Sequence, residues 1–309
     1  MPCAWPWLTA TMADALPLPL GARLRLQGPP VATLLLLVLL LWYGGAWLLN
    51  APGAIERVLR DQPWGWQDLF TATMAMERPV LPAPHQVAAD FWSSLVDWPL
   101  DSPRNLLFHV AVTAESTLWG FVLGSLLGLL LAVCIVHSRT LDRALLPWIV
   151  ASQSVPVLAI APIVLVILGS LGFAGVAPKA VIAMYLCFFP VTVAMVQGLR
   201  SPQRIETEMM HTYAASRWQA LWLLRLPASL PFLFPALRVG IAAGLVGAMV
   251  AELPTGAQAG LGARLLTGSY YGNTVQIWSA LVMSALLGLL LTSLVAGLEH
   301  LALRQRRQA

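Results

Sequence analysis

Long apolar runs constrain this chain more than any other feature of its sequence. Several of them approach or exceed the roughly 20 residues that a helix needs to cross the hydrocarbon core of a bilayer. Hydrophobic residues make up 58% of the 309 positions and charged residues only 10%, whereas about one quarter of a soluble globular protein is charged. A β-barrel would need alternating segments of about ten residues, and none is visible. The sequence therefore predicts an all-α, polytopic membrane protein with about six transmembrane helices.

The positions of the spans follow from the apolar runs and the polar residues that bound them. We expect spans at residues 30–50, 106–136, 147–168, 179–199, 230–251 and 275–298. The third begins with the polar stretch Ser152-Gln153-Ser154-Val155-Pro156, which contains a helix breaker, and the fourth contains Pro190. Gly120, Gly124 and Gly128 recur every four residues in the second span. They share one helix face and predict close packing against another helix.

Composition divides the remainder of the chain. Residues 1–29 form an expected tail in which Gly28, Pro29 and Pro30 should break structure just before the first transmembrane helix. Residues 51–105 are rich in acids, proline and tryptophan. Their apolar positions Val87, Phe91 and Leu95 predict an amphipathic helix over 86–95 that lies at the membrane interface. Residues 106–300 hold the other five spans, and residues 301–309 form a basic tail.

The distribution of arginine sets the expected orientation, because cytoplasmic loops of membrane proteins carry an excess of Lys and Arg. With six spans, both termini lie on the same side. If that side is the cytoplasm, the inner segments hold Arg23, Arg25, Arg139, Arg143, Arg200, Arg204, Arg217, Arg225, Arg304, Arg306 and Arg307. The outer segments are longer and richer in acids, and they hold Arg57, Arg60, Arg78, Arg104, Lys179 and Arg264. We therefore expect the N- and C-termini and residues 200–228 to be cytoplasmic, and residues 51–105 to be periplasmic.

A polar segment, Glu206–Pro227, lies between the fourth and fifth spans and predicts two short helices. Ser201 is expected to cap the first helix, with Pro202 at its first helical position. Met209, Met210, Tyr213 and Ala214 recur at helical spacing and form one apolar stripe. Such a stripe suits a groove in another protein, although core packing explains it as well, and a solvated loop helix without a partner is the alternative.

The second helix of this segment has a sharper start. Ser216 followed three residues later by Gln219 matches a capping box, in which each side chain satisfies an N–H group of the new helix. The apolar pattern continues through Leu221 and Leu224, and the helix is expected to stop at Pro227, which lacks an N–H group.

Patterns that mark catalytic or metal sites are missing from the sequence. It contains no phosphate-binding GxxxxGK[ST] loop and no HExxH, and its three cysteines lack metal-ligand spacing. We therefore expect neither catalytic residues, nor a metal, nor a cofactor on this chain. The net charge of +4 is attributed to membrane topology and not to nucleic-acid binding.

Ionisable residues in the spans are few, and they lie near span ends. They are His109, Glu115, Arg238 and Glu252. Such groups are functional candidates by default, although near a span end they can also extend to water. An ion-coupled secondary transporter or channel is the alternative function, but it would be expected to carry acids near the membrane midplane or a pair of broken helices in corresponding halves.

The polar segment resembles the cytoplasmic EAA loop of binding-protein-dependent ABC importer permeases of the type I fold. That pattern reads E-A-A, three residues, G, nine residues, I, one residue, L-P. It aligns without a gap on Glu208, Met209, Met210, Ala214, Leu224, Leu226 and Pro227. Met-Met stands where the pattern has Ala-Ala, and Ala stands where it has Gly. Further segments look like the nitrate/sulfonate/taurine branch, namely Ser154-Val155-Pro156 with Pro162, Phe188-Phe189-Pro190 with Thr192 and Gly198, and Ala251-Glu252.

The resemblance implies a transport subunit that is not itself an enzyme. Residues 106–300 would be the permease core, with the coupling loop at 200–228. The coupling residues implied are Glu208, Met209, Met210, Tyr213, Ala214, Ser216, Leu224, Leu226 and Pro227. The translocation path would include Ser154, Pro156, Pro190, Thr192 and Glu252.

The same resemblance implies a set of partners in a bacterial inner membrane. ATP and Mg²⁺ would be bound by a separate ATPase subunit present in two copies. A second permease subunit, expected to form a homodimer, and a periplasmic or lipoprotein solute-binding protein would complete the importer. The solute would be a sulfonate- or nitrate-like anion, or a thiamine-pyrimidine or similar heterocyclic precursor. The segment Glu252–Asn273, with Tyr270 and Tyr271, looks more like the heterocycle importers, although the tyrosines suit an interfacial belt equally well.

Overall fold

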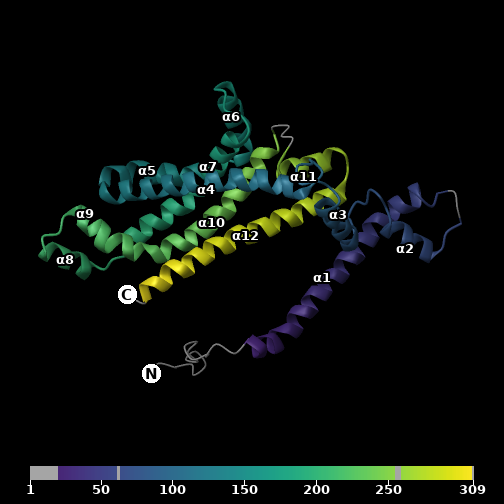
Figure 1. Cartoon of the computed structure of the whole chain (residues 1–309), viewed down its shortest axis with the longest axis horizontal. Helices are drawn as coiled ribbons and strands as arrows, with labels where there is room; N and C mark the ends of the chain where they lie inside the picture. The colour runs from purple at the N-terminus through teal and green to yellow at the C-terminus, as the bar shows by residue number, and fades with distance from the viewer. Residues whose placement is uncertain (1–19, 61–62, 255–258, 308–309) are drawn as a thin grey trace, which may run out of the picture. The chain divides into compact units, whose positions relative to one another are not determined.

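A computed structural model describes residues 20–60, 63–254 and 259–307, and every regular element within them is a helix (Figure 1). The chain divides into two compact units, residues 1–84 and 85–309. Among these described residues, five helices are long and apolar enough to cross a membrane, or six if one bent pair counts as a single span. The prediction of an all-α, polytopic membrane protein is confirmed. Residues 1–19 of the expected N-terminal tail lie outside the described residues.

The first unit consists of α1 (Leu20–Arg57) and α2 (Trp66–Met74). The expected break before the first span is wrong, because α1 runs through Pro29 and Pro30. The φ angle of proline fits a helix, but each proline removes one N–H hydrogen bond and its ring pushes on the carbonyl four residues earlier. The chain returns to α1 at Asn50, whose buried side chain accepts from the N–H of Val80 at 2.7 Å and donates to the carbonyl of Leu81 at 2.8 Å.

The second unit is built around α4 (Leu106–His137), α7 (Val176–Leu199) and α10 (Leu226–Glu252), which pack on one another (Figure 1). The glycine face of α4 meets α7. A Cβ atom added at Gly120 would lie 2.3 Å from that of Ala183, and one at Gly124 would lie 2.8 Å from that of Cys187. The close packing predicted from the glycine spacing is confirmed, since any side chain there would push the two helices apart.

Two further helices complete this core from the C-terminal side. They are α11 (Leu261–Tyr270) and α12 (Thr274–Arg307), and α12 packs along α10 and α4. The amphipathic helix predicted over 86–95 is α3 (Pro84–Val96). Its apolar face contacts protein, because Phe91 and Leu95 pack on a cluster that includes Leu106 and Leu261. The apolar face of α3 therefore packs against other residues of the second unit.

The expected third span is broken. Residues 139–170 form α5 (Arg139–Ser152) and α6 (Val157–Ser170), whose axes differ in direction by 102° (Figure 1). The break falls at the polar stretch where the sequence places a helix breaker, and the bent pair can count as one span. The turn lies at the polar residues before Pro156, where the N–H groups of Gln153 and Ser154 bond back to Val150 and Ala151 at 3.2 and 3.0 Å. Pro156 has an extended backbone and is the cap residue before α6. It cannot continue the helical hydrogen bonds of α5, because proline has no N–H group.

Between α7 and α10 the chain forms three short elements. They are α8 (Arg204–Thr212), α9 (Arg217–Ala220) and the π-helical turn η1 (Leu221–Arg225). We call residues 203–225 the two-helix segment.

Candidate functional site

The first helix of the two-helix segment begins two residues later than the sequence predicts. The helix cap is Gln203, whose N–H donates to the Glu206 carboxylate at 2.8 Å. Ser201 is not the cap, because its hydroxyl donates instead to the carbonyl of Gly198 at 2.8 Å and so closes α7. Serine hydroxyls often bond back to a carbonyl three or four residues earlier, which competes with capping a later helix. Glu206 also places a negative charge in the first turn, where the helix dipole favours it.

The turn between α8 and α9 depends on Ala214, whose φ angle is +51°. The N–H of Ala214 donates to the carbonyl of His211 at 2.9 Å, and the N–H of Ala215 donates to that of Met210 at 3.0 Å. This pair of bonds is a Schellman motif, which normally places glycine at the residue in the left-handed conformation. The glycine of the EAA pattern aligns on this same position. The structure thus gives that glycine a physical reason and shows that alanine is strained here.

The start of α9 is as predicted. The N–H of Ser216 donates to the Gln219 side chain at 2.7 Å, and the N–H of Gln219 donates to the Ser216 hydroxyl at 3.2 Å.

The expected stop at Pro227 is wrong. The N–H of Leu226 bonds to the carbonyl of Leu221, five residues back, so the helix widens for one turn and continues as α10. The wide turn and the fixed φ of Pro227 let the helix pass the proline.

Neither α8 nor α9 contains a buried residue. The side chains of the predicted apolar stripe do not share one environment. Met209 is 59% and Tyr213 77% exposed, whereas Met210 is half-buried and lines a pocket behind the segment. Glu208 is exposed and pairs with Arg204 at 2.7 Å. Trp218 and Trp222 are also mostly exposed. Large apolar side chains gathered at the surface of a polar segment are typical of a surface that binds another protein.

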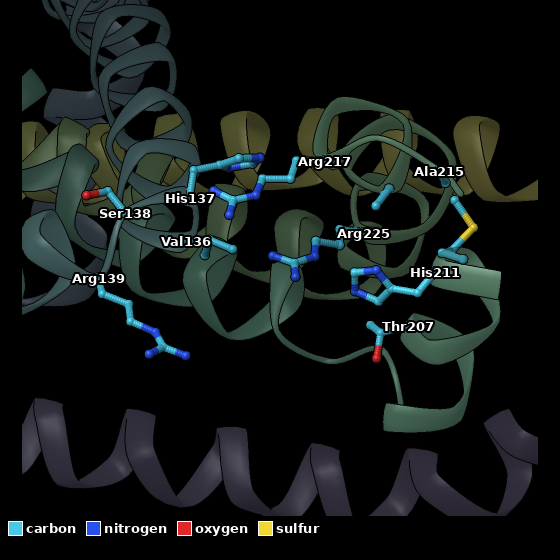
Figure 2. Close-up of a pocket in the computed structure, with 11 residues that line it drawn as sticks. Val136, His137, Ser138, Arg139, Thr207, His211, Ala215, Arg217 and Arg225 are labelled. Atoms are coloured by element: carbon cyan, nitrogen blue, oxygen red, sulfur yellow. The ribbon is translucent and has the colours of Figure 1, made fainter. Parts of the chain in front are cut away.

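The pocket behind the segment has a volume of about 690 Å³ (Figure 2). It lies between the turn that joins α4 to α5 and the helices α8, α9 and η1. Figure 2 shows basic side chains from both sides of it, and its lining residues are Val136, His137, Ser138, Arg139, Thr207, Met210, His211, Ala215, Arg217, Ala220 and Arg225. Sequence reasoning used these arginines only for topology, because nothing in their spacing shows that they meet.

The residues expected along a translocation path are not gathered in one place. Ser154 and Pro156 are exposed in the break between α5 and α6, and Pro190 is half-buried in α7. The hydroxyl of Thr192 is buried and donates within α7 to the carbonyl of Phe188 at 2.7 Å. Glu252 belongs to a separate polar cluster. A common path through these residues therefore stays a prediction.

That cluster surrounds the Glu252 carboxylate, which is fully buried at the end of α10. It accepts from the Thr113 hydroxyl at 3.0 and 3.1 Å, from the N–H of Gly262 at 2.8 Å and from the Lys179 ammonium at 3.4 Å. The ammonium also donates to the carbonyl of Ala259 at 3.1 Å. Glu252 thus joins α4, α7, α10 and α11, and it does not extend to water.

His109 and Gly260 lie beside the same cluster. His109 is 3% exposed, and its Nδ1 accepts from the N–H of Gly260 at 3.0 Å while its Nε2 donates to the carbonyl of Pro103 at 2.8 Å. Gly260 has a φ of +124°, and a Cβ atom there would lie 2.2 Å from the Glu252 carboxylate. The other two ionisable candidates are elsewhere, because Glu115 is exposed and Arg238 pairs with Glu299 of α12.

A family of transport proteins matches most of this chain. The family described as "Binding-protein-dependent transport system inner membrane component" matches residues 124–307, which include the two-helix segment and every residue that lines the pocket. The chain belongs to this family. It is therefore a permease of binding-protein-dependent transport, with the all-α fold of that class.

Individual relatives agree with the assignment. The permease is 34% identical over 225 residues to the riboflavin transport system permease protein RibX of Chloroflexus aurantiacus, with 73% of this chain and 80% of the relative covered. It is 30% identical over 242 residues to the formylaminopyrimidine transport permease protein ThiX of Halalkalibacterium halodurans, covering 77% and 91%. It is 26% identical over 227 residues to the putative aliphatic sulfonates transport permease protein SsuC of Bacillus subtilis, covering 74% and 78%.

Proposed function

We propose that this permease is the membrane-spanning subunit of an ABC importer in a bacterial inner membrane and that its two-helix segment docks on a cytoplasmic ATPase subunit. The observation that carries the proposal is the exposure of two large apolar side chains, Met209 in α8 and Tyr213 at its C-terminal end, which are 59% and 77% exposed. Family membership supports the ATP-driven partner. The assembly has two copies of this permease, two ATPase subunits that bind ATP and Mg²⁺, and a solute-binding protein on the outer side.

The connection from the segment to the core explains how such docking drives transport. Residues 217–252 form one continuous helical rod of 36 residues, which reaches about 54 Å at 1.5 Å per residue. Its first turns belong to the two-helix segment, and its last residue, Glu252, joins four helices at the other end. A displacement of the segment is therefore carried along the rod to the far end of the core.

We further propose that the solute is a planar nitrogen heterocycle. The support is that the 34% and 30% identical relatives are named for riboflavin and formylaminopyrimidine, whereas those named for sulfonates and nitrate are 26% and 24% identical. Tyr270 and Tyr271, which are 80% and 73% exposed at the end of α11, offer aromatic faces on which a planar ring stacks. Competition for uptake by riboflavin, formylaminopyrimidine and an alkanesulfonate tests this. Competition by the sulfonate alone contradicts it.

The docking role is tested by Glu208→Arg in cells that express the permease with its ATPase and binding-protein partners. We expect solute uptake and copurification of the ATPase subunit to be lost while membrane insertion is kept, because the charge at the docking face is reversed. The matched control is Arg204→Gln, which removes the same ion pair at 2.7 Å without reversing charge at position 208. An exposed pair of this kind contributes only about 0.3–0.5 kcal/mol, so the control should transport normally.

Two outcomes would contradict the proposed function. Normal uptake by Glu208→Arg removes the docking role. Uptake by the purified permease alone in liposomes, driven by an ion gradient, would instead identify it as an ion-coupled secondary transporter or channel.

A further inference from the structure

The pocket behind the two-helix segment is unusually basic. Arg139, Arg217 and Arg225 line it together with His137 and His211, and none of the described residues that line it is acidic. Figure 2 shows the arginines entering from both sides, with Arg139 on the α4–α5 turn and the other two on α9 and η1. Like charges that share one hollow repel each other, so this arrangement is stabilised when an anion enters.

The acids closest in sequence to these arginines are already paired with other groups. Asp142 of α5 pairs with Arg200 at 2.9 Å. Glu206 bonds to the N–H of Gln203, and Glu208 pairs with Arg204. Within the part of the chain that the structure describes, Arg139, Arg217 and Arg225 make no side-chain hydrogen bond or ion pair. Their guanidinium groups therefore keep all of their donors for a ligand.

The pocket also has a fixed wall. The ring of His137 is held by a bond from its Nδ1 to the carbonyl of Val133 at 2.9 Å, and it stacks on Trp218 with ring centres 5.4 Å apart. This ring contact connects the end of α4 to α9. Arg225 is half-buried, and it is carried by the π turn, a local widening that often occurs at functional sites.

From these observations we propose that the pocket binds an anion of the phosphate class, either free phosphate or the phosphate of an anionic lipid headgroup. Arginine forks match phosphate oxygens with paired hydrogen bonds, and three arginines share this lining. The bound anion joins the α4–α5 turn to α9 and η1 and so holds the two-helix segment against the core. Met209 and Tyr213 do not line the pocket, so the site is distinct from the proposed docking face.

Anion binding by this pocket does not depend on the proposed docking role. The test therefore measures binding to the purified full-length permease in a neutral detergent, without an ATPase subunit. Inorganic phosphate and pyrophosphate are titrated by calorimetry, and retained phosphatidylglycerol is counted by native mass spectrometry against phosphatidylcholine. Saturable phosphate binding without retained lipid assigns a free anion, and selectively retained phosphatidylglycerol assigns a lipid headgroup.

The variants are Arg217→Gln and Arg225→Gln, with Arg143→Gln as the matched control. Arg143 is an exposed arginine on the same α5 helix as Arg139, but it does not line the pocket. We expect each pocket variant to weaken binding about tenfold, as is usual for loss of a charged hydrogen-bond donor, and the control to bind as the native chain does. Arg225→Lys keeps the charge and should recover part of the binding that Arg225→Gln loses. Such recovery shows that the loss in Arg225→Gln does not come from a folding defect.

Three results would overturn the proposal. The first is that the native permease binds neither phosphate, pyrophosphate nor phosphatidylglycerol, as expected if the pocket instead receives an acidic side chain of the ATPase. The second is that Arg143→Gln weakens binding as much as the pocket variants do. The third is that the double variant Arg217→Gln with Arg225→Gln still binds with native affinity. None of these results bears on whether Glu208→Arg abolishes uptake, so the two proposals fail separately.

Discussion

The helical rod 217–252 ends in two polar regions that are built in opposite ways. At one end the carboxylate of Glu252 is fully buried, and Thr113, Lys179 and Gly262 all donate to it. At the other end neither α8 nor α9 has a buried residue, and Met209 and Tyr213 are exposed. The carboxylate of the first region has its bonding partners within the chain, whereas large apolar side chains of the second region remain exposed. This difference supports the proposal that the Glu252 end fixes the core and that the two-helix segment binds another protein.

The largest expected effect tests the Glu252 end. Glu252→Leu leaves the Lys179 ammonium buried without its partner, which destabilises the protein by about 3–5 kcal/mol. The measurement is the free energy of unfolding in mixed micelles. The double variant with Lys179→Met removes both charges and should recover much of that loss. A Glu252→Leu protein as stable as the native permease would show that this cluster does not fix the core.

The next effect tests the start of α9. Ser216→Ala removes the acceptor for the N–H of Gln219 and should destabilise the segment by about 1 kcal/mol. Ser201→Ala is the matched control, since the Ser201 hydroxyl bonds back to α7 and caps the N-terminus of neither α8 nor α9. Loss of helical hydrogen-exchange protection over 217–225 is the readout. An equal effect of the two substitutions would contradict the assigned caps.

A smaller effect of opposite sign is expected at the turn. Ala214→Gly relieves the left-handed conformation at φ +51°. It should stabilise the segment by about 0.5–1 kcal/mol, because glycine's greater freedom in the unfolded chain offsets part of the gain. Ala215→Gly, at the next residue, has no such strain to relieve and should not stabilise it. Thermal unfolding of both variants gives the comparison.

The smallest expected change in stability is at Met209. Met209→Asp alters an exposed side chain and should change the free energy of unfolding by no more than about 0.5 kcal/mol. Its association with the ATPase subunit should nevertheless weaken strongly, because a charge is placed in an apolar contact. Stability and copurification are measured on the same preparation. A large loss of stability would mean that Met209 belongs to the core.

These two regions also differ in how well the sequence predicts them. The capping box at Ser216 involves residues only three positions apart, so a local pattern identifies it. The Glu252 cluster depends on Thr113, 139 positions earlier, and only its helix-end location is visible in the sequence. The basic pocket is missed for the same reason, since Arg139 and Arg225 meet only after α4, α5 and η1 have packed.

The errors in the predicted helices have local causes. Pro156 correctly indicates a break, but its neighbours do not reveal the 102° change of direction between α5 and α6. Pro227 is taken as a stop because a regular α-helix needs its N–H group, and the π turn before it removes that requirement. Ser201 has the residue type of a cap, yet a carbonyl of the preceding helix competes for its hydroxyl.

Hydrogen exchange of the permease, alone and assembled with its ATPase subunit, tests the central claim most directly because it reports on both ends of the rod at once. We predict that assembly increases protection across 204–220, where no residue is buried in the chain alone, and leaves 109–113 and 259–262 at the high protection they already have. Unchanged protection across 204–220 in a complex shown to be intact would contradict the claim that the two-helix segment is the docking site.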